Sequence, residues 1–206
     1  MNKWYAQQLP MQADPSTMLR QLLESVAPLS STSIRSIREV ARIRSMEKDA
    51  LLCEEGKKDA NEYFLLEGLA YRFNRSEDGK PITTGFWRAP EVMIPHFART
   101  QKGLSIFSVQ MLTDVSVAVV SVRDFDRLRA EHPDIGRWGN RVVERQLLQS
   151  LQEETVFRAH DAKRRLTLLR KQFPGLENNV PHHLIASYLG ITPVSFSRLR
   201  KQMARQ

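Results

Sequence analysis

The stretch "HHLIASYLGITPVSFSRLR", residues 182–200, has the spacing of two short helices that meet at a tight corner. Ala186 is small enough for a second helix to cross close to it, and Gly190 stands where a sharp turn needs a residue that tolerates positive φ. Thr192 can cap the second helix, and Pro193 suits its first position, where a missing N–H costs nothing. The spacing therefore predicts a helix-turn-helix.

The second helix of this motif would present a polar and basic outer face. A helix fits the major groove of DNA, and its N-terminal residues come closest to the base edges. Arg198 can donate two hydrogen bonds to a guanine. Lys201, like Arg200 and Arg205, is expected to contact phosphates. The candidate DNA-binding residues are Thr192, Val194, Ser195, Ser197, Arg198 and Lys201.

The net charge of +8 lies entirely in the last third of the chain. Residues 137–206 contain 13 of the 31 Lys and Arg but only 5 of the 23 Asp and Glu, whereas residues 1–136 are balanced. A basic segment favours a polyanionic partner, because neutralising phosphates releases counterions. Two packed helices without DNA would also satisfy the spacing, and the local excess of positive charge favours the DNA-binding interpretation.

Length and composition bound the class of protein. A chain of 206 residues, 41% hydrophobic and 26% charged, suits one large globular domain or two small ones. Its longest apolar run, residues 115–122, is too short to span a bilayer, and the N-terminus lacks the apolar core of a signal peptide. The single cysteine, Cys53, cannot form an internal disulfide or a Cys-ligated metal site. We therefore expect a cytoplasmic protein with no membrane contact.

The middle of the chain is rich in strands. Between residues 50 and 122 the apolar period shifts towards two, and Asp78-Gly79 is a strong hairpin signal. Helical patterns precede these strands at 16–29 and 31–43, and Ser16 is expected to cap the first of them. Several short strands at close spacing favour an antiparallel sheet or roll, so the predicted fold class is α+β.

A long helix follows the strands. Apolar side chains recur along it at helical spacing, and Trp138, Val142, Leu147 and Leu151 are the candidate dimerisation residues. This stripe can either pack on the sheet or pair with a second copy, and the sequence leaves both possibilities open. Asp161 can cap a further helix. The predicted parts are an extension (1–17), a β-rich sensory domain (18–133), the long helix (134–158) and a helix-turn-helix domain (159–206).

This arrangement resembles the Crp/Fnr superfamily of bacterial transcription regulators, the cyclic-AMP receptor-like proteins. The resemblance covers about residues 18–206 and is sharpest in "YFLLEGLAYRFNRSEDGKPITTGFW" (63–87), "KRRLTLLRKQFPGL" (163–176) and "VPHHLIASYLGITPVSFSRLRKQ" (180–202). The last two look like the branch found in Bacteroidetes-type bacteria. The resemblance implies a cyclic-nucleotide-binding-like jelly roll, a dimerisation helix and a winged-helix-like DNA-binding domain. It also implies a homodimer that reads a two-fold-related operator on double-stranded DNA and contacts RNA polymerase.

The ligand-binding signature of that family is altered here. Nucleotide-binding members carry a Gly-Glu pair, a small helix, and then Arg followed by Ser or Thr, which hold the cyclic phosphate and the ribose. Glu91 matches the acidic position, but Pro90 replaces the glycine. Ser105 stands where the arginine is expected, and Arg99 is offset from it. The ligand-pocket candidates are therefore Glu91, Arg99 and Ser105.

These departures lead us to expect no cyclic nucleotide, cofactor or metal. We interpret Glu91 as a surface or capping carboxylate. An apolar insert favours a pocket filled by the protein's own side chains, namely Val92, Met93, Ile94 and Phe97.

The recognition helix departs from the family as well. Many members place Arg and Glu one turn ahead of the matching Arg, and these positions are Pro193 and Val194 here. Arg198 is the one base-reading arginine that carries over, and Val194 can contact a thymine methyl instead.

Three functions compete at this point. A non-enzymatic transcription regulator with a degenerate or altered ligand pocket agrees best with the charge and the helix-turn-helix. The second is a small-ligand-binding module whose C-terminal domain is mainly a protein-interaction surface. The third is a cupin-like enzyme, which needs clustered His and carboxylate ligands on strands, and the predicted strands at 62–74 and 104–122 contain no histidine.

Overall fold

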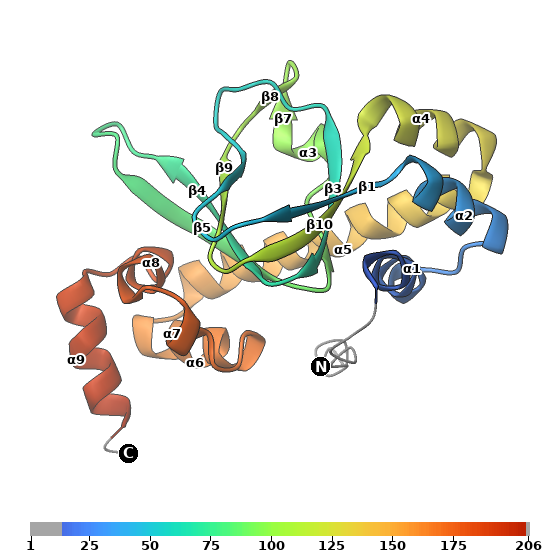
Figure 1. The fold of residues 1–206 in the computed structure, drawn as a ribbon. Coiled ribbons are helices and arrows are strands. Elements are labelled where there is room, and N and C mark those ends of the chain that lie inside the picture. Colours follow the sequence, from blue (N-terminus) through green and yellow to red (C-terminus); the bar gives the residue numbers. More distant parts are fainter. Residues whose placement is uncertain (1–13, 205–206) are drawn as a thin grey trace.

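The computed structural model describes residues 14–204, and Figure 1 shows their arrangement. A β-roll lies at the centre, and one long helix runs along it. The N-terminal helices α1 and α2 lie near one end of that helix, and the short helices α6, α7, α8 and α9 gather at the other end (Figure 1). In chain order the helices are α1 (Pro15–Val26), α2 (Ser31–Val40), α3 (His96–Arg99), α4 (Val122–Glu131), α5 (Pro133–Ala159), α6 (Ala162–Gln172), α7 (Leu176–Asn179), α8 (His182–Tyr188) and α9 (Pro193–Met203).

Two four-stranded antiparallel sheets form the roll, as the two-residue apolar period predicts. The first has the order β1 (Arg42–Met46), β10 (Val115–Ser121), β3 (Asn61–Glu67) and β6 (Glu91–Val92). The second has the order β2 (Leu51–Cys53), β9 (Ser108–Met111), β4 (Leu69–Arg75) and β5 (Pro81–Arg88), and a small pair joins β7 (Thr100–Gln101) to β8 (Leu104–Ser105). The β4–β5 hairpin turns at Gly79, whose φ is +74°, so the predicted hairpin is confirmed.

The N-terminal helices differ from the prediction at their ends. Asp14, not Ser16, caps α1, because its Oδ1 accepts the Ser16 N–H at 2.9 Å. The helix therefore begins ahead of the boundary that we placed after residue 17, and residues 1–13 of the predicted extension lie outside the described residues. The second helix ends at Val40 rather than at residue 43, because the following residues pair with β10 as strand β1.

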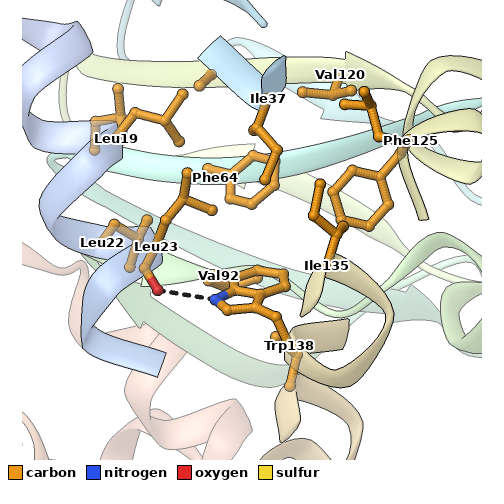
Figure 2. Close-up of a cluster of buried hydrophobic side chains, with 14 of the residues drawn as sticks. Leu19, Leu22, Leu23, Ile37, Phe64, Val92, Val120, Phe125, Ile135 and Trp138 are labelled. Atoms are coloured by element: carbon orange, nitrogen blue, oxygen red, sulfur yellow. Dashed lines mark hydrogen bonds between the residues drawn. The ribbon is translucent and has the colours of Figure 1, made fainter. Parts of the chain in front are cut away.

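The core beneath the first sheet ties α5 to the N-terminal helices (Figure 2). The indole Nε1–H of Trp138 donates to the carbonyl oxygen of Leu23 at 2.8 Å. Its ring lies 6.2 Å from that of Phe64 and 6.4 Å from that of Phe125, centroid to centroid. Phe125 belongs to α4, a helix that the periodicity did not separate from its surroundings. The first half of α5 is therefore part of the core of its own chain.

Candidate nucleic-acid interface

Helices α8 and α9 meet at the corner that the sequence predicts. Gly190 adopts φ +67°, and the Ile191 N–H donates back to the Ala186 carbonyl at 3.0 Å. Thr192 caps α9, since its Oγ1 accepts the Ser195 N–H at 3.1 Å. Leu184, Ile185, Ala186, Leu189 and Phe196 are buried between the helices and the rest of this domain. The helix-turn-helix is thus confirmed. Residues 160–204 are helices and turns only, so the described chain adds no strand that could serve as a wing.

The outer face of α9 carries two cations that have no intramolecular partner among residues 14–204. Val194 is 60% exposed although it is apolar. Arg198 and Lys201 are exposed and make no ion pair or hydrogen bond within residues 14–204. The other predicted DNA-binding residues, Thr192, Ser195 and Ser197, are exposed on the same helix or its cap. One surface therefore carries two unpaired cations, small hydroxyl groups and one apolar contact.

Arg200 has a structural partner that the sequence did not reveal. Its Nε lies 2.9 Å from a carboxylate oxygen of Glu177, and the Arg170 Nε lies 2.6 Å from the other oxygen. Although burial acts to raise the pKa of Glu177, the two guanidinium groups hold it below its usual value. Arg200 thus ties α9 to α7 and α6, and its expected phosphate contact stays a prediction, since the side chain is still 38% exposed. Arg205 lies outside the described residues.

The helix-turn-helix domain packs on the edge of the roll. The backbone N–H of Thr83 on β5 donates to the Ser187 hydroxyl of α8 at 3.0 Å. The Phe86 ring lies 5.3 Å from that of Tyr188 and 6.3 Å from that of Phe173. This contact joins residues about a hundred positions apart, and no periodicity in the sequence indicates it.

Arg99 does not face a ligand site. Its side chain is 2% exposed and lies 2.9 Å from the Asp59 carboxylate and 3.6 Å from that of Glu62. The guanidinium also lies over the Tyr63 ring, 4.6 Å from its centroid. Because both carboxylates and a ring already surround it, this arginine is a buried structural cation, and it is not available to a phosphate.

The other two pocket candidates also have protein partners. Glu91 forms an ion pair with Arg145 of α5 at 2.9 Å, and burial raises the pKa of Glu91. Our interpretation of Glu91 as a surface or capping carboxylate is wrong, because the carboxylate is half-buried and joins the roll to α5. Ser105 is buried, and its hydroxyl donates to the Phe107 carbonyl at 2.7 Å. The structure therefore does not bring the three candidates together around a common space.

Side chains fill the interior of the roll. Met93, Trp87 and Phe107 are buried there with the apolar residues of both sheets. A cavity between β5 and α5 holds about 10 Å³, which is the room of a single water molecule. Phe97 departs from the expected filling, because its side chain is 58% exposed on α3, where it lines a second cavity of about 60 Å³ with Val92 and Met93.

The four candidate dimerisation residues fall into two groups. Trp138 and Val142 are 2% and 3% exposed and belong to the chain's own core, so they are not free to contact a second copy. Leu147 and Leu151 are 59% and 53% exposed, and Leu148 beside them is 56% exposed. The apolar stripe therefore packs on the roll in its first half and is uncovered in its second half, where α5 contacts the roll through polar side chains such as Gln146 and Glu153 instead.

Residues 14–204 contain neither a metal-binding cluster nor a membrane-spanning helix. Among residues 14–204, no three His, Cys, Asp or Glu side chains gather closely enough to hold a metal ion. Within the same residues, no helix combines the length and apolar character needed to cross a membrane.

A double-sheet roll, a long helix and a C-terminal helix-turn-helix together define the fold of the Crp/Fnr-type regulators. The chain is similar to FixK2 from Bradyrhizobium japonicum, at 18% identity and a TM-score of 0.71 over 81% of this chain and 86% of that one. It is similar to the c-di-GMP-responsive global regulator CLP from Xanthomonas campestris, at 12% identity and a TM-score of 0.68 over 85% of this chain and 92% of that one. A protein from Eubacterium rectale assigned to the Crp/Fnr family gives 10% identity and a TM-score of 0.69 over 85% and 84% of the two chains.

These similarities confirm the fold that the sequence resemblance implied. No family profile and no curated protein sequence matches the chain. The Bacteroidetes-type branch stays a prediction.

Proposed function

We propose that this chain is a cytoplasmic DNA-binding transcription regulator of Crp/Fnr type that reads a two-fold-related operator as a homodimer. The observation that carries the proposal is the outer face of α9. Its first turn is capped by Thr192, Phe196 anchors its inner face, and Arg198 and Lys201 extend outwards with no ion pair among residues 14–204. A helix held in this way can enter a major groove with its N-terminal residues nearest the bases.

The second half of α5 supports a homodimer. Leu147 and Leu151 lie four residues apart and therefore share one helix face, and both are more than half exposed together with Leu148. Exposed large apolar side chains that gather on one surface are typical of protein interfaces. A two-fold pairing of α5 would present two α9 helices, and half-sites one helical turn apart require a separation of about 34 Å. RNA polymerase is the further partner that such a regulator would contact.

The roll supports a sensory domain that does not bind cyclic AMP. Arg99 and Ser105 are committed to protein partners, and Trp87 and Phe107 fill the interior. Titration calorimetry with cyclic AMP and cyclic GMP tests this part of the proposal. We expect no saturable heat from either nucleotide, and a saturable heat would favour the small-ligand-binding module instead.

DNA recognition is tested by comparing Arg198→Ala with Lys201→Ala on duplexes selected from a randomised pool. We expect Arg198→Ala to weaken selected duplexes by about 1–3 kcal/mol and to relax the sequence preference at one position of each half-site. Lys201→Ala should weaken all duplexes alike and reduce the salt dependence. Arg44→Ala, an exposed change on β1, is the matched control and should leave binding unchanged. Equal affinity of the wild-type protein for every duplex at every salt concentration would contradict specific regulation.

A further inference from the structure

Arg72 is a charged residue of the roll that is not part of the proposed DNA-binding face on α9. It lies on β4, and its guanidinium carbon is 5.8 Å from the ring centroids of both Trp87 and Phe107 in the roll interior. Its Nε donates to the Thr84 carbonyl at 3.1 Å, and its Nη2 lies 3.6 Å from a carboxylate oxygen of Glu153 on α5. One side chain therefore connects the two strands of the hairpin with the long helix.

Gly85 leaves the space that this guanidinium occupies. It pairs with Arg72 across the β4–β5 ladder, at a register shift between Arg72 and Phe73. A Cβ at position 85 would lie 2.7 Å from the Arg72 Nε and 3.2 Å from its guanidinium carbon. Gly85 is not among the residues with positive φ, so its backbone conformation does not require glycine. The missing side chain therefore serves the placement of Arg72.

The Arg72–Glu153 ion pair connects two elements that contact the helix-turn-helix, because Arg72 on β4 also donates to the Thr84 carbonyl of β5 and Glu153 lies on α5. On β5, Phe86 follows Gly85 directly and packs its ring on Tyr188 of α8. On α5, Phe157 lies one turn beyond Glu153, and a Cβ at Gly190 would be only 3.1 Å from its ring. The ion pair thus joins the two surfaces on which α8 and its turn rest.

We propose that Arg72 is a positioning residue for DNA reading, whose ion pair with Glu153 fixes β5 against α5 and so fixes the orientation of α8 and α9. The two side chains are 21% and 26% exposed, so the pair is less screened by water than a surface pair. The charged group at the contact between the roll and α5 is therefore the Arg72 guanidinium, a side chain of the protein itself. This inference rests on the proposed DNA-binding function, because α9 is the element being oriented.

The test combines two single variants with matched controls. Arg72→Met keeps the length of the side chain and removes its charge, and Glu153→Gln removes the other charge. The controls are Arg75→Met, at an exposed arginine on the same strand, and Glu154→Gln, at the next residue on α5, which pairs with Arg158 at the surface. We expect each test variant to bind its selected duplex about tenfold more weakly than either control does. The double variant should lose no more than one single variant, because both remove the same ion pair.

A second readout does not depend on DNA. Hydrogen exchange at the Thr83 amide, which donates to Ser187, should become faster in both test variants and stay unchanged in both controls. Gly85→Ala keeps both charges but displaces the guanidinium, so it should reproduce the effect of Arg72→Met on both readouts. If Arg72→Met does not fold, Glu153→Gln and Gly85→Ala decide the question.

The outcomes separate this inference from the proposed function. Normal DNA affinity together with normal exchange at Thr83 in Glu153→Gln would overturn the positioning role. If the wild-type protein binds no duplex, the proposed function fails, and exchange at Thr83 still decides whether the ion pair holds α8 in place. Weaker binding of random and selected duplexes alike would also count against positioning, because it would indicate a general loss of positive charge.

Discussion

Replacing Trp138 by phenylalanine separates a core role from a dimerisation role. The carbonyl of Leu23 lies in the last turn of α1, where carbonyls lack an intrahelical partner, and it accepts the Trp138 indole N–H at 2.8 Å. Phenylalanine has no donor, and an unsatisfied buried carbonyl costs about 1–3 kcal/mol. The smaller ring also leaves space beside Phe64 and Phe125, which costs about 1 kcal/mol more. We therefore expect the free energy of unfolding to fall by roughly 2–4 kcal/mol.

Urea unfolding followed by far-UV circular dichroism measures this loss, at one protein concentration because oligomerisation shifts apparent stability. Trp87→Phe is the matched control, because Trp87 is also buried but makes no hydrogen bond through its indole within residues 14–204. Its loss should be about 1 kcal/mol. Equal losses in the two variants would refute the contribution of the indole–carbonyl bond. A shift of Trp138→Phe to a folded monomer, seen by sedimentation, would refute its assignment to the core.

Three further predictions concern acid stability, the corner and the helix stripe. Although burial acts to raise the pKa of Asp134, hydrogen bonds from the Ser30 N–H and the Ser33 hydroxyl lower it from 3.8 to about 2. The Asp134 carboxylate therefore stabilises the fold above about pH 4, and this stabilisation is lost as the pH falls towards 2. In urea unfolding, the difference in the free energy of unfolding between the wild-type protein and Asp134→Asn should shrink from about pH 6 to about pH 3. Gly190→Ala should lower the free energy of unfolding by about 1 kcal/mol or more, because φ is +67° and Phe157 lies 3.1 Å from the added Cβ. Gly56→Ala, at φ +75° in open space, should lose less in the same urea measurement, and equal losses would exclude the Phe157 contact. Leu151→Glu should convert the proposed dimer to a monomer in sedimentation, whereas Gln152→Glu, a change at the exposed neighbouring position, should not. A monomeric wild-type protein would contradict the proposed α5 interface.

Local signals predicted the elements whose ends are determined by neighbouring residues. The corner at Gly190, the cap at Thr192 and the hairpin turn at Gly79 all depend on backbone preferences that act within a few positions. The same reasoning misplaced the end of the second helix. The residues after Val40 form a strand because they pair with β10, which lies about 75 positions later in the chain. Local sequence preferences do not indicate this pairing.

The candidate site was predictable in part for the same reason. The exposed face of α9 follows from helical spacing around Phe196, so its outward residues could be named from the sequence. The partners of Arg200, Arg99 and Glu91 come from other helices and strands. The sequence around a charged residue does not indicate which oppositely charged residue it will pair with.

The sequence by itself determined that this chain has an antiparallel roll, a long helix and a basic helix-turn-helix, because periodicity, caps and turn residues act over short distances. Only the tertiary structure decided which half of α5 is buried, that Arg99 is a structural cation, and that Arg72 of the roll faces Glu153. Those outcomes depend on which surfaces come into contact. Apolar burial and ion pairing join residues that are far apart in the chain, and both form only when the whole chain folds.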